Sequence, residues 1–245
     1  MRIQDSVVLI TGGNRGLGKS LVQAFLDAGA KKIYVGSRTL IETADPRLQP
    51  IKLDITNARD VEAAAEVCRD VTILVNNAGV AGFPTFLTAP SLTPAREMME
   101  TNYFGTLAMA RAFAPVLKRN GGGVLVNMLS VLSWFTTPSS GMYSASKYAA
   151  LSLTDGIRTE LRAQGTLVTA VHAGYIDTDM VANINAPKTS PETIAASIIE
   201  GVEQDREEVL ADQPSHRVKA ALASDRQGFY QQVQADWDKA QQQVG

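Results

Sequence analysis

The 245-residue sequence has little of the cysteine and histidine from which disulfide frameworks and metal centres are built. Cys68 is its only cysteine, which excludes an internal disulfide and a cysteine-based metal cluster. Cys68 follows the apolar-rich run 61–67, so we expect a small buried core residue rather than a nucleophile. The two histidines, His172 and His216, do not have the spacing of metal ligands, and we expect no metal site.

The chain also lacks a basic tract and an apolar run of membrane-spanning length. With 23 Lys and Arg against 25 Asp and Glu, the formal net charge is -2, which gives no electrostatic reason for a nucleic acid or an anionic membrane as partner. The first strand-like segment begins within a few residues of Met1, which leaves no room for a signal peptide. We therefore expect a cytoplasmic protein that binds neither nucleic acid nor membrane.

What the sequence does contain is a regular alternation of short apolar runs and helical patterns. Apolar, strand-like runs occupy 7–10, 31–37, 51–53, 71–75, 124–128 and 167–171. Helix-like stretches occupy 19–28, 57–69, 95–119 and 141–162, and Asn57 is a suitable cap for the second of these. This order predicts an α/β protein with a doubly wound parallel sheet, the Rossmann fold. No linker divides the chain, so we expect one domain over 1–245, with a core to about 212 and a helical C-terminal extension over 213–245.

A glycine-rich loop lies between the first apolar run and the first helical stretch. Residues 11–18 read Thr-Gly-Gly-Asn-Arg-Gly-Leu-Gly. Glycines let the backbone approach a ligand closely, and the N-terminus of the following helix favours an anion. The spacing Gly-x-x-x-Gly-x-Gly differs from the common dinucleotide fingerprint. The loop predicts a phosphate site, and an ordinary strand-to-helix turn remains the alternative.

Polar residues follow two more strand-like runs, at the edge where open α/β sheets bind ligands. Asn76, Asn77, Ala78 and Gly79 end the fourth run, and Ser130 follows the fifth. In the next helical stretch, the sequence Tyr-Ser-Ala-Ser-Lys places Tyr143 and Lys147 one turn apart on the same face. A nearby ammonium is expected to lower the phenol pKa from about 10, which would suit acid–base work near neutral pH. Such a pair alone is equally consistent with a solvated surface pair.

Taken together with Asn102, these motifs resemble those of the short-chain dehydrogenase/reductase family, from Ser6 to about Leu210. The resemblance implies that Tyr143 exchanges a proton with the substrate oxygen while a nicotinamide exchanges a hydride with the carbon. It further implies that Ser130 holds that oxygen, that Lys147 binds the nicotinamide ribose and that Asn102 joins a proton relay. A capping role for Ser130 and a buried polar role for Asn102 are the structural alternatives.

Two arginines indicate which nicotinamide cofactor is bound. The second strand-like run ends in Ser37 and Arg38 without an acidic residue, and Arg15 lies in the glycine loop. A carboxylate would repel a 2′-phosphate, whereas guanidinium groups pair with it, so we predict NADP(H). By resemblance, Asp54 contacts the adenine amino group, Asn76 and the backbone of Ala78 and Gly79 follow the adenosine half, and Ile176 and Thr178 contact the carboxamide. The predicted cofactor residues are Gly12, Asn14, Arg15, Gly16, Leu17, Gly18, Ser37, Arg38, Asp54, Ile55, Asn76, Ala78, Gly79, Tyr143, Lys147, Gly174, Ile176 and Thr178.

The chain departs from the family pattern at three places. Ala173 stands where proline is usual before Gly174, Leu129 stands where many members have a first serine, and the C-terminal segment is polar and helix-prone. Apolar residues recur in that segment, several at helical spacing: Leu222, Phe229, Tyr230, Val233 and Trp237. A helix packed on its own subunit, an assembly element and a substrate lid all fit this pattern. We expect a homodimer and leave a tetramer open.

The expected substrate is a small carbonyl compound or alcohol with an apolar or aromatic body. Apolar side chains flank the predicted reaction centre at Ala81, Phe83, Trp134, Phe135, Met142 and Tyr175. A regulator that only senses NADP would need the glycine loop but not Asn102, Ser130, Tyr143 and Lys147 together. An epimerase or dehydratase of the extended relatives would usually carry a larger C-terminal substrate domain.

Overall fold

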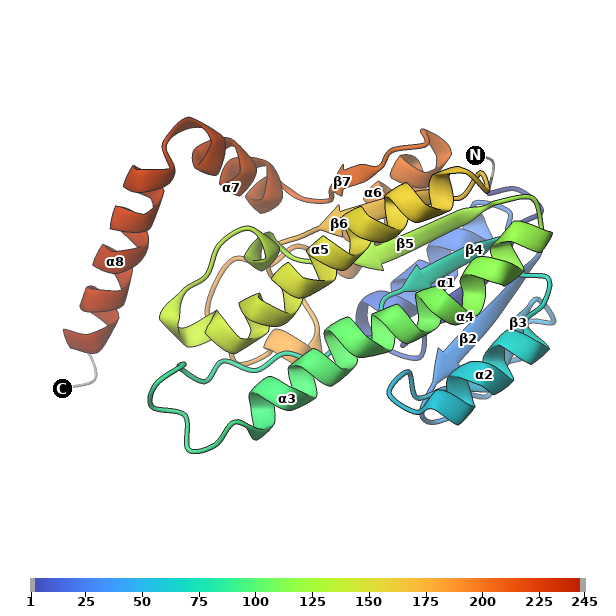
Figure 1. Cartoon of the computed structure of the whole chain (residues 1–245), viewed down its shortest axis with the longest axis horizontal. Helices are drawn as coiled ribbons and strands as arrows, with labels where there is room; N and C mark the ends of the chain where they lie inside the picture. Colours follow the sequence, from blue (N-terminus) through green and yellow to red (C-terminus); the bar gives the residue numbers. More distant parts are fainter. Residues whose placement is uncertain (1–2, 243–245) are drawn as a thin grey trace.

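A computed structural model describes residues 3–242 and shows a parallel sheet of seven strands covered by helices on both faces (Figure 1). The strand order is β3-β2-β1-β4-β5-β6-β7, and every neighbouring pair is parallel. The strands are β1 (Val7–Thr11), β2 (Lys32–Ser37), β3 (Leu48–Lys52), β4 (Ile73–Asn76), β5 (Val124–Met128), β6 (Leu167–His172) and β7 (Glu208–Leu210). The predicted doubly wound fold is confirmed.

Eight α-helices of the described chain surround the sheet or follow it. They are α1 (Gly16–Asp27), α2 (Ala58–Val67), α3 (Thr93–Met99), α4 (Thr106–Arg119), α5 (Gly141–Arg162), α6 (Pro191–Glu203), α7 (Gln213–Ser224) and α8 (Arg226–Gln242). Asn57 caps α2 as predicted, since its side chain accepts from the main-chain N–H groups of Arg59 and Asp60.

Alternate residues of each central strand fill two separate cores. Val8 and Ile10 of β1 face the cluster formed with α1 and α6, whereas Val7 and Leu9 face the cluster formed with α2, α4 and α5. Successive strand side chains point to opposite faces, so a strand covered on both sides needs apolar residues at every position. Cys68 is fully buried in the second cluster, where burial raises the pKa of its thiol to about 12.

The predicted long helix over 95–119 is interrupted. A π-helical stretch, Glu100–Gly105, separates α3 from α4 and contains Asn102. The apolar periodicity continues through this stretch and does not mark the break; the resemblance of Asn102 to a family position with a distorted helix is the signal that fits it. π-Helical turns are frequent at functional sites because they redirect a side chain.

The other boundaries differ from prediction for local reasons. α1 begins at Gly16 rather than Lys19, with Gly16 at a φ of 50° that glycine tolerates. β3 begins at Leu48 and includes Pro50. β3 is one of the two edge strands of the sheet, where the missing proline N–H is tolerated.

The C-terminal helices α7 and α8 extend away from the sheet (Figure 1). The only residue of α7 that is fully buried is Ser215, and α8 has none. Phe229 of α8 packs edge-on against Phe135, with ring centroids 4.9 Å apart. Helices α7 and α8 occupy the segment expected over 213–245, of which 243–245 lie outside the described residues, and α8 packs on its own subunit through a small aromatic contact.

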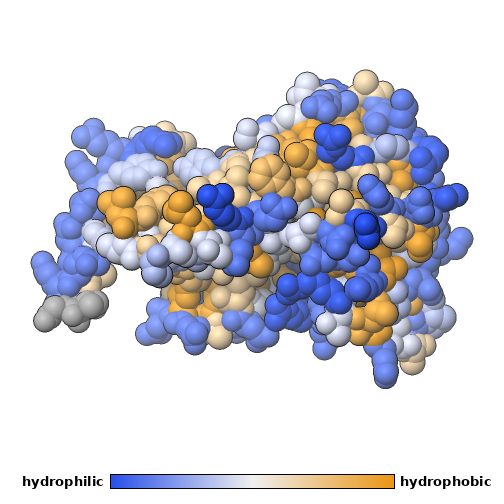
Figure 2. Space-filling view, turned by 60° about the horizontal axis from the view of Figure 1, so that its bottom comes forward, coloured by the Kyte–Doolittle hydropathy of each residue, from blue (hydrophilic) through white to orange (hydrophobic). Residues whose placement is uncertain are grey.

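The described chain contains no helix long and apolar enough to cross a membrane. Figure 2 shows that apolar side chains on the face it presents gather in separate patches divided by polar ones. The large apolar side chains with the greatest exposure include Leu87, Val67 and Leu92.

Candidate active site

The glycine loop is held against the end of β2 and the first turn of α1. Gly13 N–H donates a 3.2 Å hydrogen bond to Gly36 O. A β-carbon on Gly18 would lie 2.0 Å from Gly12 O, so α1 packs directly on the loop. Arg15, the residue that precedes α1, makes no side-chain capping bond. The first N–H groups of α1 are thus suited to an anionic ligand, and the loop fits a dinucleotide phosphate.

Thr11 and Asn77 fasten the glycine loop to the turn that follows β4. Thr11 Oγ1 accepts from the main-chain N–H groups of Asn77, at 3.0 Å, and Ala78, at 2.9 Å. Asn77 Nδ2 donates to Thr11 O at 2.9 Å. Sequence reasoning assigned neither side chain a role, although a threonine that ends a buried apolar strand is a usable signal of such a bond.

The end of β2 carries one of the two arginines that are predicted to bind the 2′-phosphate of the cofactor. Arg38 and Arg15 are both exposed, and each lies two residues from one partner of the Gly13–Gly36 hydrogen bond. Ser37 is buried and donates to Thr39 O at 2.6 Å. Hydrogen bonds from Thr56, and less so the charge of Arg38, hold the pKa of Asp54 below its usual value. Both arginines therefore lie close in sequence to the contact that joins the glycine loop to the end of β2.

Three of the predicted catalytic side chains meet where β5 ends and α5 begins. Tyr143 and Lys147 project from one face of α5, and the Lys147 ammonium lies 5.8 Å from the Tyr143 ring centroid. Ser130 follows β5 by two residues, and its side chain lies close enough to the Tyr143 phenol to lower the phenol pKa, against the larger effect of burial. Leu132 N–H donates to Ser130 Oγ at 3.1 Å, which fixes the hydroxyl. Tyr143 and Ser130 can therefore contact one substrate oxygen together.

The prediction that the Lys147 ammonium lowers the pKa of the Tyr143 phenol is wrong for this structure. Burial raises the pKa of Tyr143 to about 12, and burial lowers the pKa of Lys147 to about 8. The Lys147 ammonium donates to Met128 O at 2.8 Å. Desolvation of the phenol outweighs the influence of a cation that is directed at another acceptor.

Asn102 joins the turn after β4 to α5. Its Oδ1 accepts from Val80 N–H at 2.9 Å, and its Nδ2 donates to Val80 O and to Ser146 Oγ, both at 2.9 Å. A β-carbon on Gly79 would lie 3.2 Å from Asn102 Oδ1 and 3.9 Å from Lys147 Nζ. The structure brings Asn102 close to the Tyr143–Lys147 face, and its relay role stays a prediction.

The loop after β6 closes the other side of the predicted cofactor site. A β-carbon on Gly16 would lie 3.2 Å from Thr178 Cγ2, so this loop touches the glycine loop. Ile176 forms an isolated parallel bridge with Thr189. Tyr175 lies near enough to Tyr143 for its charge to raise the phenol pKa slightly further. Most of the predicted cofactor residues therefore lie along the carboxyl edge of the sheet.

The predicted aromatic walls divide into two groups. The Phe83 ring lies 6.5 Å from the Tyr143 ring, and Tyr175 is near the same phenol. Met142 is 4% exposed and belongs to the packed interior. Phe135 packs against Phe229, and the Trp134 ring stacks on His172 at 4.0 Å. Phe83 and Tyr175 remain wall candidates, whereas Met142 is a core residue.

His172 contacts the segment that carries Ser130. Its Nδ1 lies 3.0 Å from Ser133 Oγ and 3.1 Å from Ser130 O. Within residues 3–242, its buried Nε2 has no hydrogen-bond partner. Burial lowers the pKa of His172 to about 4. The sequence indicated a strand-end histidine, which is confirmed, but gave no sign that its ring holds the carbonyl of Ser130.

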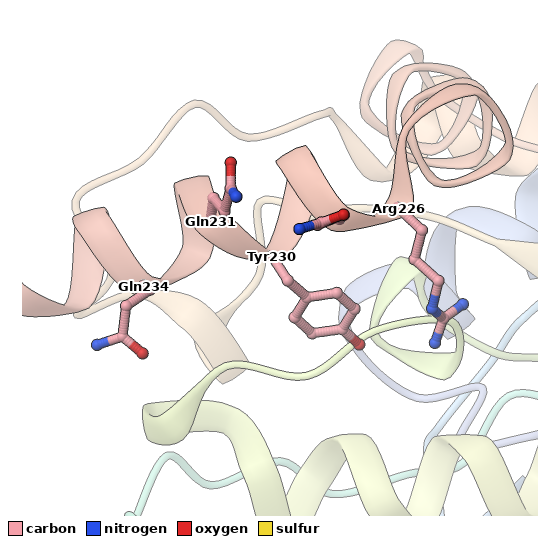
Figure 3. Close-up of a pocket in the computed structure, with 5 residues that line it drawn as sticks. Arg226, Tyr230, Gln231 and Gln234 are labelled. Carbon is pink, nitrogen blue, oxygen red and sulfur yellow. The ribbon is translucent and has the colours of Figure 1, made fainter.

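A hollow of about 530 Å³ lies along α8, lined by Arg226, Gln227, Tyr230, Gln231 and Gln234. Figure 3 shows Arg226 and Tyr230 pointing from α8 toward the yellow-green segment that leads into α5. Tyr230 and Arg226 lie near Tyr148 of α5, and burial together with the proximity of Tyr230 raises the pKa of Tyr148. The lining side chains belong to α8 alone, and the hollow is separate from the predicted catalytic residues.

Comparison with known proteins places most of the chain in the short-chain dehydrogenase family. Residues 6–189 match the family model described as short chain dehydrogenase. The dehydrogenase/reductase SDR family member 7B of Xenopus tropicalis is 30% identical over 240 residues, covering 85% of this chain and 77% of that protein.

Solved structures agree with the fold. A short chain dehydrogenase from Burkholderia cenocepacia in complex with NADP is 40% identical, with a TM-score of 0.92 over 95% of this chain and 99% of that one. A short chain dehydrogenase/reductase from Burkholderia phymatum in complex with NAD is 22% identical, with a TM-score of 0.78 over 92% and 93% of the two chains. The first similarity includes most of the C-terminal helical segment.

Proposed function

Since the chain belongs to the short-chain dehydrogenase family, we propose that this oxidoreductase moves a hydride between NADP(H) and a small carbonyl compound or alcohol, with Tyr143 as acid or base. The observation that carries the proposal is the meeting of Ser130, Tyr143 and Lys147 beside Asn102, at the sheet edge that also holds the glycine loop. A bound nicotinamide would supply or accept the hydride.

The chain's own residues would manage the proton and the orientation of the substrate. Tyr143 would donate its phenolic proton to the carbonyl oxygen in reduction, and Ser130 would hold that oxygen through its hydroxyl. Burial keeps Tyr143 protonated through neutral pH, which suits the acid role. The Lys147 ammonium would hold the nicotinamide ribose and add positive charge beside the phenol as it loses its proton.

The preference for NADP(H) rests on charge at the rim. Arg15 and Arg38 flank the Gly13–Gly36 hydrogen bond, and the end of β2 carries no carboxylate where NAD sites commonly place one. Guanidinium groups pair bidentately with phosphate, so both arginines favour a 2′-phosphate. The 40% identical structure from Burkholderia cenocepacia contains NADP, which supports the same choice.

The substrate is a compound with an apolar body next to its carbonyl group. Phe83 and Tyr175 lie beside Tyr143 and would pack against such a body. NADPH absorbance followed with a panel of aliphatic and aromatic aldehydes and ketones, with NADH in parallel, tests the proposal. Substrate-dependent NADPH oxidation supports it. Tight NADPH binding without turnover across the panel would instead identify a regulator that senses NADP.

A further inference from the structure

Asp212, between β7 and α7, has a carboxylate that is almost completely enclosed. The residue is 7% exposed. Its Oδ1 accepts from Ser215 N–H at 2.9 Å, and its Oδ2 accepts from Gly174 N–H at 2.8 Å and from Thr189 Oγ1 at 3.3 Å. The two oxygens thus serve different elements: one caps α7 and the other binds the loop after β6.

Oδ2 binds this loop near both of its ends. Thr189 N–H donates to Tyr175 O at 2.8 Å, and Asp177 N–H donates to Thr189 O at 2.9 Å, so the loop is already closed on itself. A β-carbon on Gly174 would lie 2.9 Å from Pro214 Cβ, which shows how closely α7 is seated on the start of the loop. Asp212 holds the closed loop against the first turn of α7.

The far side of the same loop reaches the glycine loop. Thr178 Cγ2 would lie 3.2 Å from a β-carbon on Gly16. The loop therefore spans the distance between the first turn of α7 and the phosphate-binding turn. Displacing it from Asp212 would also displace Ile176 and Thr178, which are expected at the nicotinamide end of the cofactor.

We propose that Asp212 is a positioning residue that keeps the loop over 174–189 in the arrangement that binds the cofactor, and so couples helix α7 to cofactor affinity. The inference rests on the proposed function. A cofactor binds a protein with an apparent affinity reduced by the fraction of molecules in the competent arrangement, and the three hydrogen bonds to Asp212 raise that fraction.

Two variants distinguish the effect of the hydrogen bonds to the loop from the effect of the cap on α7. Asp212→Asn keeps a single acceptor oxygen, which can accept from Ser215 N–H or from Gly174 N–H but not from both, because the NH₂ group cannot accept. Ser215→Ala is the matched control. It removes the hydroxyl that donates to Asp212 O at 2.7 Å and leaves both carboxylate oxygens in place. Asp212→Ala, a third variant, removes both acceptors.

The decisive measurements are NADPH affinity by fluorescence titration and amide hydrogen exchange over 174–189 in the cofactor-free protein. We expect Asp212→Asn and Asp212→Ala to weaken NADPH binding by about tenfold or more, the usual effect of losing a hydrogen bond to a charged group. Exchange over 174–189 should accelerate in both variants, and KM for NADPH should rise more than kcat falls. Ser215→Ala should match wild type in NADPH affinity. Thermal unfolding checks that each variant is folded.

Asp212 variants that bind NADPH as wild type does and exchange at the wild-type rate would overturn the inference alone. An equal loss of affinity in Ser215→Ala would also overturn it, because the effect would then come from the helix cap. A wild-type protein that binds neither NADPH nor NADH would overturn the proposed function and this inference together.

Discussion

The Lys147 ammonium donates a 2.8 Å hydrogen bond to the main-chain carbonyl of Met128, the last residue of β5. Met128 precedes Ser130 by two residues, so this bond joins the helix that carries Tyr143 to the segment that carries Ser130. Lys147 therefore has a structural partner in the cofactor-free protein, besides its expected contact with the nicotinamide ribose.

Replacing Lys147 with methionine should show whether the ammonium is needed for cofactor binding and catalysis rather than for folding. A buried methionine fills similar space, and because burial already lowers the pKa of Lys147 to about 8, removing the ammonium relieves a desolvation penalty. We expect Lys147→Met to fold stably yet to weaken NADPH binding and to lower kcat by about 100-fold or more. Thermal unfolding and steady-state kinetics check this, and unchanged kcat would contradict it.

Arg38→Asp should change the cofactor preference. A carboxylate in place of an exposed guanidinium repels a 2′-phosphate and accepts hydrogen bonds from a ribose hydroxyl. We expect kcat/KM with NADPH to fall by about 100-fold, with that for NADH equal or higher. Arg59→Asp, at an exposed position of α2, is the control for the charge change. An unaltered NADPH preference in Arg38→Asp would refute the assignment.

Two glycine-to-alanine changes should have opposite effects on stability. A β-carbon on Gly18 would lie 2.0 Å from Gly12 O, so Gly18→Ala forces the glycine loop away from α1. We expect a loss of about 1–3 kcal/mol in the free energy of unfolding and weaker NADPH binding. Gly156 of α5 is exposed with nothing within 4 Å, and Gly156→Ala should stabilise by about 1 kcal/mol. Denaturant unfolding compares the two.

His172 should make the protein less stable in mild acid. Burial lowers the pKa of His172 to about 4, against about 6.5 in the unfolded chain, so between these values the unfolded state binds more protons. The free energy of unfolding therefore falls by up to about 3 kcal/mol as pH drops from 6.5 to 4.

His172→Asn should remove this contribution. Asparagine does not titrate and can still donate to Ser130 O from a position close to that of Nδ1. Unfolding followed from pH 4 to pH 7 should show a shallower slope than in wild type. His216→Asn, a change at an exposed position of α7, should keep the wild-type slope. An identical slope in His172→Asn and wild type would contradict the burial argument.

The fold was predictable because its signals are local. Apolar runs such as 124–128 contain enough β-branched residues to specify strands, and α5 was predicted with its observed bounds, Gly141–Arg162. The interruption at Asn102 was not predictable from periodicity. It depends on hydrogen bonds to Val80 and Ser146, which are distant in sequence.

Which residues form the site was easier to predict than the pKa values and supporting contacts of those residues. Spacing along a helix places Tyr143 beside Lys147, but the pKa of each depends on burial and on Met128, an acceptor from another strand. The supporting contacts of His172 and Asp212 join segments about forty residues apart, 42 from His172 to Ser130 and 38 from Asp212 to Gly174. Such contacts are fixed by tertiary packing and leave no pattern in the sequence.

Tyr143→Phe is the sharpest test of whether Tyr143 is the acid. The change removes one hydroxyl, so the phenylalanine variant should fold and bind NADPH like wild type but lack the proton donor. With an aldehyde or ketone that wild type reduces, we expect NADPH oxidation to fall by about 100- to 10,000-fold in Tyr143→Phe while NADPH affinity stays the same. Oxidation at the wild-type rate in this variant would contradict the assignment of Tyr143 as the acid.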